Sequence, residues 1–394
     1  MLSGKEIWAA FGRVIRREMR LMFHQPIYFY STLIVMMVCT IFFLTLLHRG
    51  QPERMPVAVV DMDCSTISRR IVHELNATQS VVVAHRCADF AEARRMMQRG
   101  DVYAILVIPE NLYNDMLSFK RPTLTFYINA TYTMGATVAY KQLMMFGNLA
   151  SGAFQREVLR KKGLPDSLIM QRIQPIVIEG HMLSNPSSNY SVYLSSVLLP
   201  GILGLIVLVI TVFSIGMELK WKTSRNLLAE ARGSMVIAMV GKMVPHIMVY
   251  TTMGISLNIL LFRIMGFPMN GSLVWLCVGM FLYILAVQSI GVTIVGLLPV
   301  LRDALSVSAL YGMLSFSLSG FTFPVEGMPG PIQVFSWCFP LRHYFRLYVS
   351  EALMGNPTVD SMVFMGCLLL FILPQYLVNK RLKNAFIYQN YPLK

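Results

Sequence analysis

The chain has 394 residues, of which 55% are hydrophobic and only 14% are charged, and its mean hydropathy is +0.56. Soluble domains usually carry about 25% charged residues, so this composition excludes an ordinary water-soluble enzyme. Residues 49–189 are the exception, because they hold 16 Lys and Arg and 12 Asp and Glu side chains. The net charge of +14 does not indicate nucleic acid as a partner, because most of the excess lies beside apolar runs, where basic residues set membrane orientation. The sequence therefore predicts an integral membrane protein with one sizeable soluble insert.

Six uncharged runs are long enough to cross a membrane, which takes about 20 apolar residues. The predicted spans are Pro26–Leu47, Ser191–Met217, Met243–Phe262, Ser272–Leu298, Ala304–Val325 and Ser361–Asn379. The fold expected is an α-helical polytopic membrane protein with six transmembrane helices and an α/β exoplasmic domain inserted between helices 1 and 2.

The short polar flanks of these spans predict the orientation, because basic residues gather on the cytoplasmic side. With six spans, three basic flanks fall on one side. They contain Lys5, Arg13, Arg16, Arg17 and Arg20, then Lys220, Lys222, Arg225, Arg232 and Lys242, and finally Lys380, Arg381, Lys383 and Lys394. Both termini are therefore expected in the cytoplasm, and the protein is expected in the cytoplasmic (inner) membrane.

The segment before the first span has helical periodicity. Ile7, Phe11, Ile15 and Met19 recur every four residues, and arginines occupy the rest of the turn. This pattern predicts an amphipathic helix lying in the cytoplasmic membrane interface. The alternative is a solvated segment that acts only as a positive topology signal.

The insert alternates strand-like and helical stretches. The strand-like runs are Pro56–Asp61, Val81–Ala84, Val102–Ile108, Thr123–Ile128 and Ile176–Ile178, and the helical stretches are Ser65–Ala77, Phe90–Gln98 and Thr137–Lys161. Such alternation predicts a small α/β domain with a largely parallel sheet. Asp61 and Asp63 follow the first strand, and we interpret them as turn formers and helix caps rather than as a metal or catalytic pair.

The sequence contains no recognisable catalytic or nucleotide-binding motif. Gly241-Lys242 is followed by Met243 and lacks the first glycine of a phosphate-binding G-x-x-x-x-G-K-[ST] loop. No cofactor or metal is therefore expected on this chain, which we interpret as not itself an enzyme. His246 lies inside the third span, where an ionisable side chain is either functional or a neutral imidazole bonded to a neighbouring helix.

Two cysteines of the insert are candidates for a disulfide. Cys64 and Cys87 follow the first and second predicted strands, whose ends a right-handed βαβ unit places side by side. In an oxidising exoplasm, a bond between them would close a loop of about 24 residues and contribute roughly 3 kcal/mol. Two unpaired thiols are the alternative.

Several stretches carry a resemblance to a known family. The run from Glu218 to Leu228, followed by Gly241-Lys242, is similar to the family's first cytoplasmic loop, with Lys222 where many relatives have glycine. Ser319–Pro329 is similar to an exoplasmic re-entrant segment, and Pro340–Tyr344 to a motif before the last span. Val57–Asp61 fits the family's insert. Over nearly its whole length, the chain resembles the permease subunits of ABC-type exporters of the multidrug and linearmycin-resistance kind.

This resemblance implies a permease that exports a hydrophobic or amphipathic substrate, such as a drug, lipid or peptide. It implies a dimer with a second copy or a paralogue, and two ABC ATPase subunits that hold ATP and magnesium. Some relatives also imply a periplasmic adaptor, and membrane lipid surrounds the spans. The alternatives are a non-transporting membrane receptor or scaffold, whose exoplasmic domain binds a protein partner, and a lipid-modifying membrane enzyme.

The resulting organisation has cytoplasmic and exoplasmic parts. Residues 1–25 form the cytoplasmic interface helix, 26–48 the first transmembrane helix, 49–189 the exoplasmic domain, 190–379 helices 2–6 with a cytoplasmic coupling loop at 218–242 and a re-entrant segment at 319–341, and 380–394 the cytoplasmic tail.

A chain without a nucleotide site needs a separate motor. We expect the helix at Ile7–Phe23 and the loop at Glu218–Glu230 to form the surface that contacts the ATPase. The coupling residues expected are Glu218, Lys220, Lys222, Thr223, Arg225, Leu227 and Leu228, with the two leucines as apolar anchors.

The segment Ser319–Leu341 is too short to cross the membrane and too apolar to lie free in water. Because broken helices at membrane depth line cavities or are buried in protein, we expect it to dip into the outer leaflet and close the pathway. The gate residues expected are Gly320, Phe321, Phe323, Pro324 and Glu326, with the two phenylalanine rings as the plug. Glu326 is expected to pair with Arg342. The alternative is an interfacial loop that Trp337 anchors at the lipid headgroups.

Overall fold

The computed structural model divides into two compact units. One unit comprises Met1–His48 and Met182–Lys394, and the other comprises Arg49–His181. The structure describes residues 4–118, 120, 122–131, 133–173, 184–185, 189–356 and 358–389. The strand-like run expected at Ile176–Ile178 lies outside these residues. The second unit is inserted into the first at the place where the charge distribution changes.

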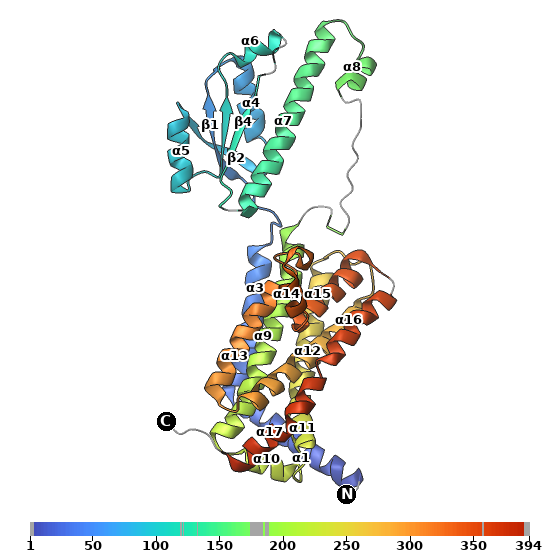
Figure 1. Cartoon of the computed structure of the whole chain (residues 1–394). Coiled ribbons are helices and arrows are strands. Elements are labelled where there is room, and N and C mark those ends of the chain that lie inside the picture. Colours follow the sequence, from blue (N-terminus) through green and yellow to red (C-terminus); the bar gives the residue numbers. More distant parts are fainter. Residues whose placement is uncertain are drawn as a thin grey trace. The chain divides into compact units, whose positions relative to one another are not determined.

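The first unit is built from helices (Figure 1). In chain order they are α1 Gly4–His24, α2 Pro26–Phe29, η1 Tyr30–Ile34, α3 Val35–Leu46, α9 Tyr190–Lys220, α10 Ser224–Glu230, α11 Met235–Ile259, η2 Leu260–Ile264, α12 Leu273–Leu297, α13 Leu301–Leu318, η3 Val325–Gly327, α14 Gly330–Ser336, α15 Pro340–Tyr348, η4 Val349–Met354, α16 Thr358–Leu370 and α17 Leu373–Tyr388. The elements α2, η1 and α3 follow one another directly, as do α11 and η2.

Five helices of the described chain are long and apolar enough to cross a membrane. They are Pro26–Leu46, Tyr190–Lys220, Met235–Ile264, Leu273–Leu297 and Val359–Tyr388. These helices match five of the six spans predicted from the sequence. The remaining predicted span, Ala304–Val325, differs from the structure, because α13 ends at Leu318 and the chain turns at Gly320 with a φ of 88°. The structure therefore describes a helical membrane protein with about five apolar spans.

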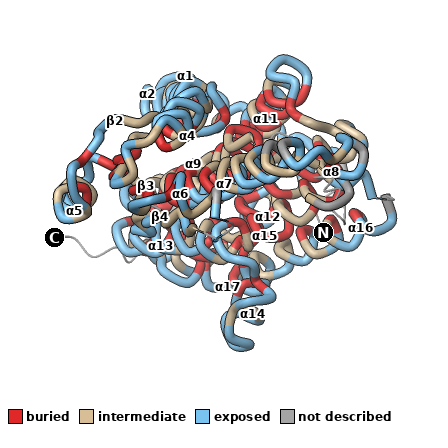
Figure 2. Tube along the Cα trace, turned by 90° about the horizontal axis from the view of Figure 1, so that it is seen from above, coloured by how far each residue is buried: buried red, intermediate tan, exposed pale blue. Residues whose placement is uncertain are grey.

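The centre of the helical unit is the packing of α9 against α12, which glycines make close. A Cβ atom on Gly204 of α9 would lie 1.9 Å from the Tyr283 hydroxyl of α12, and one on Gly291 of α12 would lie 2.8 Å from Cγ2 of Thr211. Figure 2 shows long buried stretches on α9 and α12 and an almost fully exposed α14. Small residues let helix backbones approach closely inside a membrane.

The second unit contains a four-stranded sheet in the order β2-β1-β3-β4. Its strands are β1 Met55–Asp61, β2 Val81–Cys87, β3 Ala104–Ile108 and β4 Thr125–Ile128. β1 runs parallel to β2 and β3, and β4 runs antiparallel to β3. The helices of this unit are α4 Thr66–Asn76, α5 Phe90–Arg99, α6 Leu112–Leu117, α7 Thr133–Lys161 and α8 Asp166–Ile173, of which α6 and α8 were not predicted.

The central strand β1 is buried on both of its faces. Val57 and Val59 belong to one apolar cluster, whereas Ala58 and Val60 belong to another. Successive side chains of a strand point to opposite faces, so an unbroken apolar run suits a strand covered on both sides. The run of valines in the sequence is thus explained by the position of β1 in the sheet.

The turn after β1 is fixed by one carboxylate. Oδ1 of Asp61 accepts bonds from the backbone N–H groups of Asp63 and Cys64, at 3.2 and 3.0 Å. The Ser68 hydroxyl donates to Oδ2 at 2.7 Å. The interpretation of Asp61 as a turn former is therefore confirmed.

The contact between α9 and α12 makes a stability prediction. We expect Gly204→Ala to lower the free energy of unfolding by about 1–3 kcal/mol, because the added methyl group overlaps the Tyr283 ring. Gly366→Ala in α16 is the control, since no atom lies within 4 Å of its Cβ position; it should be neutral or stabilise by up to about 1 kcal/mol. Thermal unfolding of the detergent-purified variants measures both. Equal midpoints for the two variants would contradict the packing described.

Candidate functional site: a buried ion cluster and the two ends of the helical unit

α1 packs along α11 through a face that the sequence did not indicate. The buried side chains of this face recur every four residues and are Ala10, Val14 and Glu18. A Cβ atom on Gly241 of α11 would lie 2.8 Å from Cγ1 of Val14. Ile7, which belongs to the predicted apolar face, is 41% exposed. α1 is the helix that was predicted, but its packing turns a carboxylate toward the bundle.

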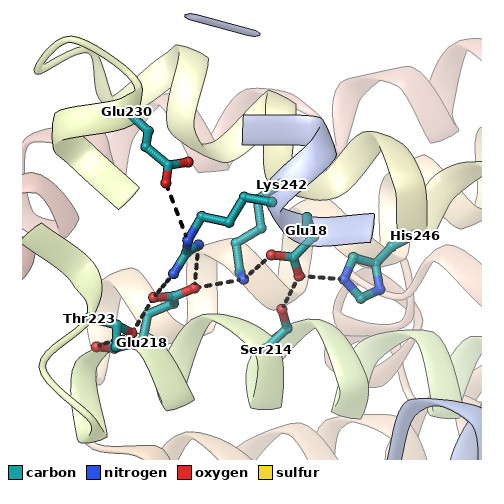
Figure 3. Close-up of polar contacts among 8 residues, drawn as sticks. Glu18, Ser214, Glu218, Thr223, Glu230, Lys242 and His246 are labelled. Carbon is teal, nitrogen blue, oxygen red and sulfur yellow. Dashed lines mark hydrogen bonds and ion pairs between the residues drawn. The ribbon is translucent and has the colours of Figure 1, made fainter. Parts of the chain in front are cut away.

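Glu18 is completely buried between α1, α9 and α11 (Figure 3). Lys242 of α11 donates from Nζ to Glu18 Oε2 at 2.6 Å. His246, one turn further along α11, lies with Nε2 at 2.9 Å from Oε1, and Ser214 of α9 donates to the same oxygen at 3.1 Å. Because an ionised carboxylate only accepts hydrogen bonds, Nε2 of His246 carries the proton. Three helices thus meet at one carboxylate.

A second carboxylate, Glu218, lies one turn after Ser214 on α9. Arg17 of α1 donates from Nη1 and Nη2 to its two oxygens at 2.8 and 2.9 Å, which is the strong bidentate arrangement. Lys242 Nζ lies 3.2 Å from Oε1, and the Thr223 hydroxyl donates to Oε2. Lys242 therefore bridges both carboxylates (Figure 3).

We define the ion cluster as Arg17, Glu18, Glu218, Lys242 and His246. Its two cations and two carboxylates sum to zero charge when the imidazole is neutral. Burial alone raises the pKa of the Glu18 carboxyl, but the Lys242 ammonium and the bond to His246 outweigh it and lower that pKa to about 2. The contribution of ionised Glu18 to stability is therefore fully present above its ordinary value of 4.5 and is lost only as the pH falls toward 2. The Glu18 carboxylate therefore stays ionised at neutral pH.

The sequence patterns do not reveal the ion cluster. They predict a coupling loop that contains Glu218 and Lys242, and they give Glu18 no role. A usable signal was present, because Ser214 and Glu218, like Lys242 and His246, are four residues apart at the ends of apolar helices and so share a helix face. The interpretation of His246 as an imidazole bonded to a neighbouring helix agrees with its contact to Glu18.

The short helix α10 shows which predicted coupling residues face outward. Lys220, Lys222 and Arg225 are exposed, and Trp221 beside them is 65% exposed. The expectation that the two leucines serve as apolar anchors for a partner differs from the structure. Leu227 and Leu228 are buried in the core of the chain's own helices and are not free to anchor a partner. Glu218 and Thr223 bond to each other, so these four residues hold α10 in place.

The chain's last helix holds α10 from the other side. Lys222 has a φ of 56°, in the left-handed region that favours glycine, which gives a physical reason for the glycine of many relatives. Gln389 donates from Nε2 to the Lys222 carbonyl at 2.9 Å and to Ser224 Oγ at 3.0 Å. Ser224 Oγ donates to the Phe386 carbonyl at 3.1 Å. The turn before α10 is therefore tied to the end of α17.

The segment predicted as a gate lies at the end of the helical unit opposite α1 and α10 (Figure 1). It consists of the turn at Gly320, then η3, then α14, and it leads into α15. Phe321 is buried, stacks on Tyr193 of α9 at 4.5 Å between ring centroids, and accepts a bond from the Tyr193 hydroxyl at its carbonyl. Its ring also meets Phe345 edge-on at 6.1 Å. Phe323 differs from Phe321, because it is 53% exposed.

The predicted ion pair of the gate has another partner. Glu326 pairs with Arg346, whose Nη2 lies 3.3 Å from Oε1. Arg342 instead donates from Nη1 to the Gln333 carbonyl at 3.1 Å, and its guanidinium lies 4.9 Å from the centroid of the Trp337 ring. Arg346 is one turn further along α15, so helical spacing allows both arginines to face this segment. The expected pair between Glu326 and Arg342 is therefore corrected.

Cys64 and Cys87 are free thiols in the structure. Cys64 is exposed in the turn after β1, and its Sγ lies 3.4 Å from the Asp61 carbonyl. Cys87 is buried at the end of β2, with Sγ 3.8 Å from Sδ of Met96. The alternative of two unpaired thiols is what the structure contains.

The apolar helices, the buried ion cluster and the broken segment before α15 define a multi-pass helical membrane protein. Residues 27–373 match the family model described as ABC-2 family transporter protein. The chain belongs to this family, which confirms the resemblance to ABC-type permeases. It is therefore a subunit of a membrane transporter, and members of this family are transport subunits that are not catalytic themselves.

Curated relatives share this assignment. The chain is 22% identical over 338 residues to the inner membrane transport permease YhhJ of Escherichia coli K12 and of Shigella flexneri, covering 86% of this chain and 84% of the relative. It is 24% identical over 268 residues to the probable multidrug ABC transporter permease YbhR of Escherichia coli K12, covering 66% and 68%.

The ion cluster allows a test of whether an unpaired buried charge costs more stability than removal of the whole pair. We expect Lys242→Met to lower the free energy of unfolding by about 3–5 kcal/mol, because Glu18 and Glu218 then face each other without their shared cation. The double variant Glu18→Gln and Lys242→Met should recover most of this loss, since Arg17 and Glu218 remain a neutral pair. Thermal unfolding in detergent measures both.

The control for this cycle is Arg302→Met in the same unit. Arg302 pairs with Asp303 at 3.2 Å but is 81% exposed, so its loss should cost less than about 1 kcal/mol. Additive losses in the double variant would show that the cluster does not act as a coupled unit.

Proposed function

We propose that this chain is the membrane-spanning permease of an ATP-driven exporter, and that a separate ABC ATPase subunit holds ATP and magnesium. The observation that carries the proposal is an exposed basic surface formed by Lys220 at the end of α9, Lys222 in the turn before α10 and Arg225 of α10. Its neighbours are fixed by the ion cluster on one side and by α17 on the other. We expect a partner bound there to displace α9, α10 and α11 together, because only the short turns 221–223 and 231–234 join these helices.

Contacts of both chain ends with the α10 region support six spans and a common side for the termini. Arg232 pairs with Glu6 near the start of α1, and Arg225 donates to the Ile387 carbonyl near the end of α17. Chain ends on one side require an even number of crossings. Five apolar spans give an odd number, so α13 is proposed as the sixth crossing. The basic residues at this end place it in the cytoplasm by the positive-inside rule.

The inserted sheet unit then lies on the exoplasmic side, because one span separates it from α1. We propose that this unit is the surface for an adaptor where one is present. The partner permease, a second copy or a paralogue, is proposed to cover exposed apolar side chains of α13 such as Leu310 and Met313, which are 58% and 67% exposed. A pathway between two permeases with such apolar side chains suits a hydrophobic or amphipathic substrate. One relative is named as a probable multidrug ABC transporter permease.

The motor surface is tested by charge reversal. The triple variant Lys220→Glu, Lys222→Glu and Arg225→Glu should fold with only a small decrease in its thermal midpoint, because the three side chains are exposed and one hydrogen bond, from Arg225 to the Ile387 carbonyl, is lost. It should fail to co-purify with the ATPase, and substrate should no longer stimulate ATP hydrolysis. Reversal of the exposed Arg94, Arg95 and Arg99 on α5 is the matched control and should change neither property. An undiminished, fully coupled ATPase with the triple variant would refute this docking surface.

The gate is tested by two phenylalanine variants that differ in burial. Phe321→Ala removes the ring between Tyr193 and Phe345 and should raise the passive leak of small solutes from proteoliposomes by several fold. Phe323→Ala removes a ring that is 53% exposed and should leave the leak unchanged. Both variants should insert normally. Identical leak rates for the two variants and the parent protein would leave this segment only an anchoring role.

A further inference from the structure

The gate end of the helical unit contains a pocket whose charges do not balance. It has a volume of about 270 Å³ and is lined by residues that include Gly320, Glu326, Arg342, Phe345, Arg346 and Phe364. Its ionisable side chains are two arginines and one glutamate. Glu326 forms its ion pair with Arg346. The Glu326 charge also acts on Arg342, but among the residues that the structure describes no carboxylate lies within ion-pair distance of Arg342.

Arg342 is not a solvated surface arginine, since the residue is only 4% exposed. Nη1 is used by the Gln333 carbonyl, and Nε is buried without an acceptor among the described residues. A buried charge is costly unless a counter-ion and hydrogen bonds compensate it. The free Nε–Nη2 edge of a guanidinium matches the two oxygens of a carboxylate or phosphate group.

We propose that this pocket binds an amphipathic anion, with its carboxylate or phosphate group at Arg342 and the start of its apolar chain along Phe345 and Phe364. The volume suits a headgroup and a few methylene groups, given that one water occupies about 30 Å³ of the liquid. Nε is covered in this conformation, so binding turns the guanidinium toward the pocket. The exposed pair between Glu326, with a side chain that is 73% exposed, and Arg346 is weak enough to open.

This site goes beyond the proposed transport function and is tested without any ATPase. Trp337 lies 4.9 Å from the Arg342 guanidinium, so its fluorescence reports the pocket after Trp8, Trp221 and Trp275 are replaced by Phe. The full-length protein in a neutral maltoside detergent is titrated with dodecyl phosphate and with laurate. Dodecanol is the matched neutral probe.

Three variants test the proposal by the direction in which they change the affinity for the anions. Arg342→Gln should weaken the binding of both anions by about tenfold or more, and Arg342→Lys should weaken it less, because the charge remains while the planar fork is lost. Glu326→Gln should strengthen it several-fold, because it removes the carboxylate that competes for Arg346. Dodecanol binding should not respond to any of the three. If Arg342→Gln does not fold, the opposite shifts of the other two variants still decide.

Two outcomes would overturn the proposal. One is that dodecanol binds as tightly as dodecyl phosphate. The other is that the affinities for the two anions are the same in the Arg342 and Glu326 variants as in the parent protein. The source of the anion is decided separately. Anionic phospholipid that co-purifies with the parent protein but not with Arg342→Gln assigns the site to membrane lipid. ATP-dependent movement of labelled laurate in vesicles with the ATPase assigns it to a transported molecule. Failure of that transport alone would count against the proposed function and leave the binding site intact.

Discussion

The constraint on which the helical unit depends is that two carboxylates are buried where three helices meet, and each needs its cations at hydrogen-bond distance. Lys242 serves both Glu18 and Glu218, so α1, α9 and α11 cannot separate without leaving like charges uncompensated. Desolvation makes such a cluster a poor source of net stability compared with apolar packing. Its value lies in specificity, because only one register of α1 against α11 brings Arg17 and Glu18 to their partners. The cluster therefore fixes a position rather than adding a large free energy.

The same register determines what happens at α10. Glu218 belongs to the cluster and also accepts the Thr223 hydroxyl, so the ionic contacts of α1 continue directly into the turn before α10. From the other side, Gln389 holds the left-handed backbone at Lys222. The exposed basic side chains are thus presented by an element clamped at both of its flanks. A left-handed backbone position and a buried ion cluster, each costly alone, together hold α10 against α9 and α17, which would limit independent movement of the surface where a motor is proposed to bind.

The sequence predicts features that local patterns encode. The apolar runs predict five of the spans, and the valine run of β1 predicts a buried strand. It does not reveal the ion cluster, because Glu18 and Lys242 are 224 residues apart and no periodicity connects them. Nor does the sequence show whether an apolar pair packs against a partner or inside the chain. Leu227 and Leu228 have the pattern of an anchor for a partner, but they are buried in the chain's own core. For Glu326 the pattern supplied two arginines one turn apart, and only the structure shows which one pairs.

The two ends of the helical unit therefore differ in how their charges are satisfied. At the α10 end, the buried cations Arg17 and Lys242 have carboxylates within hydrogen-bond distance. At the gate end, Arg342 is almost fully covered yet meets only a backbone carbonyl and an aromatic ring in the described structure. A buried cation that is paired with a carboxylate resists rearrangement, whereas an unpaired one gains from an anion that reaches it. The two ends are joined through α9, which carries Glu218 at one end and Tyr193 against Phe321 at the other, and we propose this helix as the route by which a displacement at the α10 end reaches the gate end. Paired charges thus lie at the end where a motor is proposed to bind, and an unpaired charge lies at the end where the pathway is proposed to open. The first end is therefore expected to be the more rigid and the second the more adaptable.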